Sequence, residues 1–224
     1  MPYRKTIFVN GEIYHVFNRS VARQPIYLSD TYYHRALEVL AYYNNLNVPI
    51  RYSHFSRLPV STKNEILESL NKENQKLVQV LAFCFMPNHV HFLIKEIREK
   101  GISTFMRKFQ NSYAKYFNTK TKRSGSVFQS MFKAVRILTN EQLLHVTRYI
   151  HLNPITAFIL KDVKELAHYS WSSFPVYIGR QSSNIINTEE ILSFFASKEK
   201  FIEFTKDQVE YQKELDKIKH LLLE

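Results

Sequence analysis

Cysteine is almost missing from this sequence, and this and other scarcities narrow the classes of protein to which it can belong. Cys84 is the single cysteine among 224 residues, so the chain can form neither an internal disulfide nor a site built from thiolates alone. No run of 18 apolar residues occurs, and the first 20 residues lack the apolar core of a signal peptide. Four glycines and seven prolines exclude a collagen-like or low-complexity chain. We expect a soluble, cytoplasmic protein without membrane association, with Cys84 in its core.

Acidic residues are also few relative to basic ones. The chain has 31 Lys and Arg against 20 Asp and Glu, a formal net charge of +11. Residues 100–140 contain nine basic residues and no acidic one. Scattered charges usually mark a solvated surface, but a long acid-free segment with interspersed aromatics suits phosphate backbones and unstacked bases. We therefore predict nucleic-acid binding by this segment. The predicted DNA-binding residues are Arg107, Lys108, Lys115, Lys120, Lys122, Arg123, Lys133 and Arg136.

Hydrophobic periodicity predicts the secondary structure, because side chains repeat every two residues in a strand and every 3.6 in a helix. The segments with a strand pattern are residues 11–19, 77–85, 89–95 and 127–138. The segments with a helical pattern are residues 30–49, 103–118 and 140–153. This order predicts an α+β fold in which helices pack on an antiparallel or mixed sheet.

Two parts of the chain stand outside this pattern. Residues 56–75 are polar around a short helical pattern, which predicts an insertion or a small helix. Beyond Arg180, residues at alternating steps of three and four form a heptad-like stripe on one predicted helix. The stripe consists of Phe201, Phe204, Gln208, Tyr211, Leu215, Ile218 and Leu222. We predict a main domain of residues 1–180 and a helical C-terminal extension of residues 181–224, whose stripe packs on its own domain or on another subunit.

Two histidines occupy alternate positions directly after a predicted turn. His89 and His91 begin the strand that leaves the turn, so the period of two directs both imidazoles to one side. Such a pair can chelate a metal ion, but the pattern alone is weak evidence. The alternative is two partly buried histidines that are satisfied by hydrogen bonds. The place of the pair at the end of a strand favours a site, and we expect His15 of another strand to lie nearby.

A polar stripe marks the predicted helix over residues 140–153. His145, Tyr149 and Asn153 are spaced at i, i+4 and i+8 and therefore share one face. A helical tyrosine usually belongs to the core, and the chain has 14 of them, but the polar neighbours of Tyr149 favour a functional role. Pro154 restricts the residue before it to an extended conformation. We therefore predict that the helix ends or kinks at Asn153.

Four short motifs resemble one family when they are taken together. The single-tyrosine transposases of the HUH endonuclease superfamily are similar in residues 86–91 (MPNHVH) and 14–16 (YHV), the latter followed by Arg19. Their repeat-associated branch is similar in residues 149–154 (YIHLNP) and 169–173 (YSWSS). The resemblance covers roughly residues 8–177 and leaves the tail beyond Arg180 uncovered.

The resemblance implies a ferredoxin-like α+β catalytic domain, often dimeric, that cuts and rejoins single-stranded DNA next to a hairpin. It implies that His89 and His91 are metal ligands and that Tyr149 is the nucleophile that forms a 5′-phosphotyrosine. Asn153 stands where relatives commonly carry a metal-binding glutamine; its shorter side chain would reach the metal directly, through a water or not at all. A site of two imidazoles and oxygen ligands favours Mg²⁺ or Mn²⁺.

The nucleophile and the type of reaction leave alternatives. A phenol with a pKa of about 10 needs help from the metal or a nearby base, and we hypothesise that His145 or His151 provides it. Tyr113 and Tyr116 are rival nucleophiles, but they share an apolar helix face and are predicted to be core residues. Two other functions remain open: a DNA- or RNA-binding regulator without catalysis, and a water-using metal-dependent nuclease, whose activity would survive Tyr149→Phe.

Overall fold

A four-stranded sheet forms the centre of the molecule in the computed structural model, which describes residues 6–73 and 75–207. The strands are β1 (Ile13–Arg19), β2 (Val78–Met86), β3 (His89–Glu96) and β4 (Lys133–Arg136). They lie in the order β2-β3-β1-β4, and each neighbouring pair is antiparallel. Strands β3 and β1 therefore form the middle of the sheet, and β2 and β4 are its edge strands.

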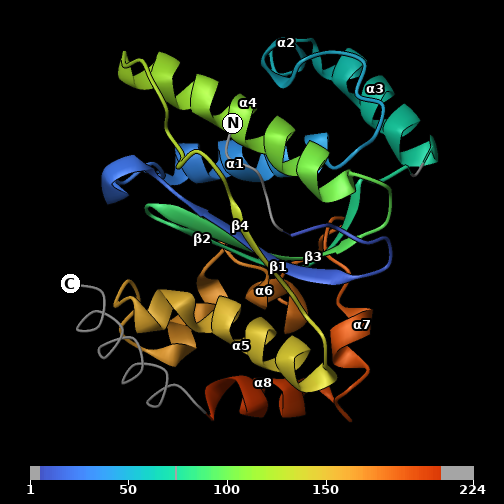
Figure 1. Cartoon of the computed structure of the whole chain (residues 1–224), viewed down its shortest axis with the longest axis vertical. Coiled ribbons are helices and arrows are strands. Elements are labelled where there is room, and N and C mark those ends of the chain that lie inside the picture. The colour runs from blue at the N-terminus through green and yellow to red at the C-terminus, as the bar shows by residue number, and fades with distance from the viewer. Residues whose placement is uncertain (1–5, 74, 208–224) are drawn as a thin grey trace.

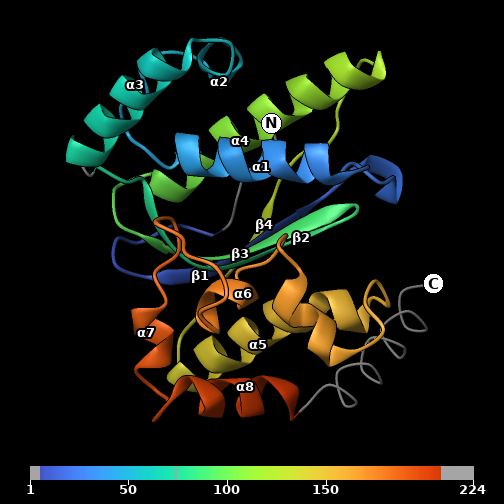
Figure 2. The same ribbon diagram turned by 180° about the vertical axis from the view of Figure 1, so that it is seen from behind.

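Helices cover both faces of this sheet (Figures 1 and 2). On one face lie α1 (Asp30–Tyr43) and α4 (Gly101–Thr121), with α2 (Tyr52–Phe55) and α3 (Val60–Glu73) beside them. On the other face lie α5 (Asn140–Thr156), α6 (Phe174–Tyr177), α7 (Glu189–Leu192) and α8 (Lys198–Lys206). Two short 3₁₀ helices are η1 (Val21–Arg23) and η2 (Val163–His168). The predicted α+β class with helices packed on a sheet is confirmed.

The two faces of the central strands differ in chemistry. In β3, Val90 and Phe92 point toward α4, and the Phe92 ring lies 5.7 Å from that of Phe105 between centroids. The alternating residues point the other way, toward α5, and include His89 and His91. Because strand side chains alternate, one face closes an apolar core and the other presents polar groups beneath α5.

The predicted fourth strand is too long. Only Lys133–Arg136 pairs with β1, whereas the segment before it makes a single isolated bridge between Phe128 and Ser20. Val127 and Phe128 are nevertheless buried. Buried apolar side chains on a loop produce the same sequence pattern as a strand, so the error follows from reading burial as pairing.

Two helix boundaries also differ from the predictions. Pro154 lies inside α5, which continues to Thr156; the prediction that the helix ends or kinks at Asn153 is wrong as to its end. A proline removes one hydrogen bond, and in the last turn this loss is tolerated because the amide of Ala157 still donates to the carbonyl of Asn153 at 3.0 Å. The polar segment 56–75 contains the full helix α3, whose only fully buried residue is Leu70.

The beginning of the predicted C-terminal extension packs on the main domain. Phe201 of α8 is fully buried, and its ring stacks on that of Tyr177 at 4.9 Å between centroids. Phe204 covers the guanidinium of Arg148 on α5 at 4.3 Å. The rest of the heptad-like stripe, from Gln208 to Leu222, lies outside the described residues. Within the described ranges, no helix has both the length and the apolar character that crossing a membrane requires.

Candidate functional site

Three imidazoles lie together on the face of the sheet beneath α5. His89 and His91 of β3 are separated by 5.0 Å between ring centroids, and His15 of β1 lies 5.1 Å from His91. The register explains this, because β1 places Phe17 opposite His91 and Arg19 opposite His89, and directly opposed residues share a face. The prediction that His15 lies near the pair is confirmed.

The side chain of Tyr149, on α5, packs against this group of imidazoles. Its ring meets the rings of His91 and His15 edge-on, at centroid distances of 5.6 and 5.9 Å. The helix is held there by contacts with β2 and β3, so the partly buried phenol of Tyr149 faces the partly buried imidazole of His15 and the buried imidazole of His91. Tertiary structure thus brings together the predicted nucleophile and both predicted metal ligands, which are almost 60 residues apart in sequence.

Hydrogen bonds orient the imidazoles. Nδ1 of His89 lies 2.6 Å from Oδ1 of Asn88; since this oxygen only accepts, Nδ1 carries the proton and Nε2 keeps its lone pair. Nδ1 of His91 lies 2.9 Å from Nε2 of His15. If His91 donates in this pair, its Nε2 also keeps a lone pair. The bond to Asn88 therefore gives His89 a tautomer suited to metal binding, and the bond to His15 does the same for His91 when His91 is the donor.

The electrostatic environment keeps the three imidazoles neutral. Burial lowers the pKa of His15 to about 4 and, together with the charge of Arg19, that of His89 to about 4. Burial and then the neighbouring His89, His15 and Arg19 hold the pKa of His91 well below its usual value. Neutral imidazoles can donate lone pairs to a cation at physiological pH.

The donor set fits a metal ion only with help from oxygen ligands. In the described part of the chain, no group of three or more His, Cys, Asp or Glu is arranged to hold a metal ion. Nε2 of His89 and Nε2 of His91 therefore make a two-imidazole set, which leaves coordination positions for water, an amide or a phosphate. Such a set suits a cation that binds together with its anionic substrate.

Asn153 lies one turn beyond Tyr149 and is bound to its own helix. Its Nδ2 donates to the carbonyl oxygen of Tyr149 at 2.9 Å, and the residue is 4% exposed. This hydrogen bond holds the side-chain amide of Asn153 against the backbone of α5, the helix that also carries Tyr149.

The two histidines that were expected to assist Tyr149 are engaged elsewhere. His151 is fully buried on the far side of α5, where Nε2 lies 2.8 Å from the hydroxyl of Ser173. Nη2 of Arg148 donates to Nδ1 of His145 at 2.7 Å, so Nδ1 of His145 already acts as an acceptor in this bond. The imidazoles in ring contact with Tyr149 are instead His15 and His91.

The predicted DNA-binding residues divide between the two faces of the sheet. Lys133 lies opposite Phe17 and so shares the face of the imidazoles. Arg136 lies on the opposite side and forms an ion pair with Glu12 at 2.7 Å. The remaining six lie on or just after α4, which packs against the other face (Figure 1). These are Arg107, Lys108, Lys115, Lys120, Lys122 and Arg123.

Within that group, most charges are available to a partner. Arg107, Lys115, Lys120 and Lys122 are exposed. Lys108 is partly buried and donates to the carbonyl oxygen of Leu46 at 3.2 Å. The Arg123 guanidinium lies 5.7 Å from the centre of the Phe117 ring and donates to the carbonyl of Ser126 at 3.4 Å.

One basic residue at the site was not among the predicted binding residues. Arg19 pairs with His89 across the β1–β3 ladder, so its partly buried side chain lies on the imidazole face. The sequence did carry a signal for this placement, because Arg19 follows His15 and Phe17 at steps of two and so shares their face of the strand. A guanidinium beside a site for an anionic substrate can bind phosphate oxygens in a bidentate manner.

Of the residues predicted to be structural, Tyr113 and Cys84 lie in the core, and Tyr116 packs against it. Tyr113 is fully buried, and its hydroxyl donates to the carbonyl of Ile26 at 2.7 Å. Tyr116 is partly buried, with the Arg35 guanidinium 4.8 Å from its ring centre. Cys84 is also fully buried, and burial raises the pKa of its thiol. Both rival tyrosines thus lie on the α4 side of the sheet, away from the imidazoles.

Comparison with known families identifies the central part of the chain. Residues 48–153 match the family model described as "Transposase IS200 like". Over these residues, the chain is similar to the IS200-like transposases. The matched range includes His89, His91 and Tyr149 and ends at Asn153.

Comparison with solved structures finds a similar fold in a protein of low sequence identity. A REP-associated tyrosine transposase bound to a REP hairpin is 14% identical, with a TM-score of 0.53 over 84% of this chain and 94% of that chain. A candidate transposase from Deinococcus radiodurans R1 is 12% identical over 66% of this chain and 95% of that chain, with a TM-score of 0.36. Comparison with curated proteins gives no significant match.

Proposed function

We propose that this protein is an IS200-like transposase that cuts and rejoins single-stranded DNA through a covalent bond to Tyr149, at a site where His89 and His91 bind a divalent metal ion. The observation that carries the proposal is the convergence of the Tyr149 ring on His91 and His15, with centroids 5.6 and 5.9 Å apart. A tyrosine next to neutral, oriented imidazoles is suited to phosphoryl transfer, because nucleophile and charge-stabilising groups meet at one point.

The chemical step is a displacement at phosphorus. The phenolic oxygen of Tyr149 forms a bond to the scissile phosphorus as its proton is released, and the bond from phosphorus to the 3′ oxygen of the preceding nucleotide breaks. That oxygen takes up a proton and leaves as a free 3′-OH. The 5′-phosphotyrosine retains the energy of the broken bond, so a 3′-OH can reverse the step and join strands without ATP.

The metal ion and Arg19 would together stabilise the negative charge of the phosphate. A divalent cation such as Mg²⁺ or Mn²⁺ supplies stabilisation of negative charge at the phosphate when bound. Nε2 of His89 and Nε2 of His91 would hold it, with Asn153 as a third ligand through its amide oxygen or a water. Arg19 would bind a nonbridging oxygen, and His15 would act through His91 by fixing its tautomer.

The proposed DNA partner is a strand with a hairpin. The solved structure of similar fold is of a protein bound to a REP hairpin, and this chain carries exposed basic residues both on α4 and on the imidazole face. We propose that α4 and the following loop bind the hairpin backbone while Lys133 and Arg19 bind the strand near the scissile phosphate. We also propose a homodimer.

The test uses hairpin DNA with single-stranded flanks and a label at its 3′ end, since the 5′-phosphotyrosine retains the downstream fragment. Wild-type protein, Tyr149→Phe and Tyr116→Phe are incubated with the DNA and Mg²⁺ or Mn²⁺, then run on a denaturing protein gel. We expect a labelled protein band with wild type and Tyr116→Phe, none with Tyr149→Phe, and none after chelation of the metal. Tyr116→Phe is the matched control because it removes a rival phenol.

Two other results would contradict the proposal. Cleavage by all three proteins without a labelled protein band would indicate a water nucleophile, and thus a metal-dependent nuclease. Binding without cleavage on several hairpins would indicate a DNA-binding regulator that keeps the fold.

A further inference from the structure

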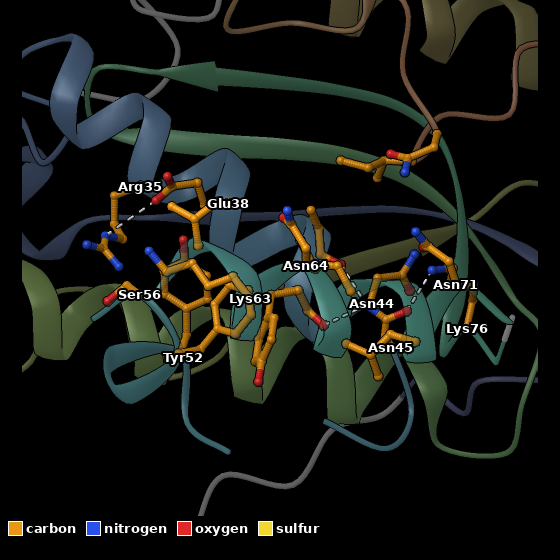
Figure 3. A pocket seen from close by; sticks show the side chains of 18 residues that line it. Arg35, Glu38, Asn44, Asn45, Tyr52, Ser56, Lys63, Asn64, Asn71 and Lys76 are labelled. Carbon is orange, nitrogen blue, oxygen red and sulfur yellow. Dashed lines mark hydrogen bonds and ion pairs between the residues drawn. The ribbon is translucent and has the colours of Figure 1, made fainter. Parts of the chain in front are cut away.

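A hollow of about 520 Å³ lies between α1, α2 and α3 (Figure 3). Its volume falls in the range of roughly 300–1,000 Å³ that is typical of small-molecule sites. The helices that form it belong to the layer opposite α5 (Figure 1), so the hollow is separated from Tyr149 by the sheet. Neither the metal site nor the proposed strand transfer uses it.

One end of the hollow is aromatic. Tyr42, Tyr52 and Phe55 pack on one another there, with ring centroids 4.7 to 5.6 Å apart. The guanidinium of Arg35 lies 4.9 Å from the centre of the Tyr52 ring and forms an ion pair with Glu38 at 3.8 Å. A wall of this kind favours a flat, polarisable ligand group.

The other end gathers side-chain amides around a cation. Figure 3 shows Asn44, Asn45, Asn71 and Lys76 at this end, with Lys63 between them and Tyr52. Asn45 is saturated, since its Nδ2 donates to two carbonyls and its Oδ1 accepts from Nζ of Lys76 at 2.6 Å. Asn71 is exposed and offers a donor and an acceptor to a ligand.

The hollow carries an excess of positive charge. Arg35, Lys63 and Lys76 line it, and Glu38 is the only acidic residue among the described residues that do so. Among the described residues, neither lysine forms an ion pair with a carboxylate. Burial lowers the pKa of Lys76, which shows that its ammonium group pays a desolvation cost that an anion would offset.

We propose that this hollow binds a single nucleotide, with its base between the tyrosine wall and the exposed amide of Asn71 and its phosphate on Lys63 and Lys76. A nucleotide combines the three features that the walls complement: an aromatic face, an edge of donors and acceptors, and negative charge. The nucleotide comes either from the bound DNA, as an unpaired residue, or from solution, as a free nucleoside monophosphate.

The surroundings of the hollow connect it to the basic helix. Lys108 of α4 donates to the carbonyl of Leu46, the residue that follows Asn45. A second hollow of about 500 Å³ shares Asn44 and Lys76 and continues along Val78 at the start of β2. A chain could therefore enter and leave past Lys76. The strand-borne source rests on the proposed function, whereas the free source does not.

The first experiment titrates the full chain with the deoxynucleoside and ribonucleoside monophosphates by calorimetry. Ala41→Phe fills the hollow from α1, and Lys63→Ala removes one of its cations. Lys72→Ala is the matched control, because Lys72 is exposed on the same helix and does not line the hollow. If the source is free, at least one monophosphate binds, and the first two variants weaken it about tenfold or more while the control does not.

The second experiment tests the strand-borne source with two hairpins, one fully paired and one with an unpaired nucleotide in its stem. Here Ala41→Phe and Lys63→Ala reduce the affinity for the second hairpin about tenfold, with less effect on the first, and Lys72→Ala affects both equally. Tyr149→Phe retains either binding mode although it forms no covalent adduct, so failure of the cleavage mechanism is distinguished from failure of this site.

Circular dichroism and the melting temperature establish that each variant is folded. Photolabelling with 8-azido-AMP then locates the site, and we expect the labelled peptide to come from residues 35–76. If no monophosphate binds and neither hollow variant changes the affinity for either hairpin relative to Lys72→Ala, the proposal is overturned.

Discussion

Asn88 lies outside the histidine pair and yet determines which nitrogen of His89 is available. Its Oδ1 accepts from Nδ1 of His89 at 2.6 Å, while its Nδ2 donates to the carbonyl of Arg23 at 2.9 Å. The same side chain therefore fixes the tautomer of a proposed ligand and ties the turn to the segment after β1. His15 has the comparable relation to His91.

Loss of the Asn88 acceptor should weaken metal binding. We expect Asn88→Ala to lower the affinity for Mn²⁺ by about 10–100-fold, the usual effect of removing a residue that hydrogen-bonds to a metal-binding histidine. Asn88→Asp retains an acceptor oxygen and should bind at least as well as wild type. Calorimetric titration with Mn²⁺ measures this, and equal affinities for Asn88→Ala and wild type would contradict the assignment.

The buried carboxyl of Glu96 should make the free energy of unfolding depend on pH. Burial raises the pKa of its carboxyl, and bonds from backbone amides, including those of Ile102 and Gly101, oppose this shift in part. Because the folded-state pKa is above that of the unfolded chain, ionisation costs stability as pH rises from about 4.5 through the folded-state value. We expect Glu96→Gln to gain stability relative to wild type over this interval, measured by urea unfolding at several pH values. A constant difference would contradict the prediction.

At the scale of elements, the first residue of α4 lies so close to the backbone of a neighbouring segment that no side chain fits there. Gly101 is the first residue of the helix, and a Cβ there would overlap the carbonyl oxygen of Leu77. The carboxylate of Glu96 accepts hydrogen bonds from the backbone amides of Gly101 and Ile102 at 3.1 and 2.9 Å. These amides lie in the first turn of the helix, where backbone N–H groups have no partner within the helix. The junction of β3, β2 and α4 thus depends on a small residue and one carboxylate.

The close contact at Gly101 gives a prediction on stability. Gly101→Ala should lower the free energy of unfolding by about 1–3 kcal/mol or more, because the backbone of Leu77 must move. Gly125→Ala is the matched comparison: φ there is +89° and no atom lies within 4 Å of the added Cβ, so we expect a cost of only about 1 kcal/mol. Urea denaturation measures both, and equal losses would contradict the steric argument.

At the scale of the whole molecule, the sheet separates two basic surfaces. Arg19 and Lys133 lie on the imidazole face, whereas Arg107 and Lys115 project from α4 on the other side. DNA that contacts both surfaces must pass around an edge of the sheet. The two surfaces should therefore contribute differently to binding and to cleavage.

Charge removal on each surface tests this division. Lys115→Ala should weaken hairpin binding and reduce the slope of log K against log salt by about 0.7–0.9, with little change in cleavage rate at saturating DNA. Lys133→Ala should lower that rate, since its charge is near the scissile phosphate. Filter binding and single-turnover cleavage measure the two effects, and identical profiles for the two variants would contradict the division.

The C-terminal segment can be tested by truncation. A chain that ends at Arg180 lacks Phe201, whose burial against Tyr177 contributes about 1.5–3 kcal/mol, so we expect a lower melting temperature. Light scattering of both chains measures assembly. If full-length protein is a dimer and the truncated chain keeps the dimer mass, exchange of the tail between subunits is excluded.

Local sequence patterns determined much of this protein. The period of two placed His89 and His91 on one side of a strand, and helical spacing singled out Tyr149. These inferences succeed because side-chain direction follows from backbone geometry over a few residues. The α+β class follows in the same way from the order of the elements.

Only tertiary structure decided which residues meet. The acid-free segment is continuous in sequence, yet Lys133 and Lys115 lie on opposite faces because a helix and an edge strand carry them to different layers. His151 was a plausible base for Tyr149 by proximity in sequence, but α5 turns it into the core against Ser173. Arg19 and Asn88 join the site through strand register and a side-chain hydrogen bond. Long-range pairing and packing set these contacts, and short-range periodicity does not encode them.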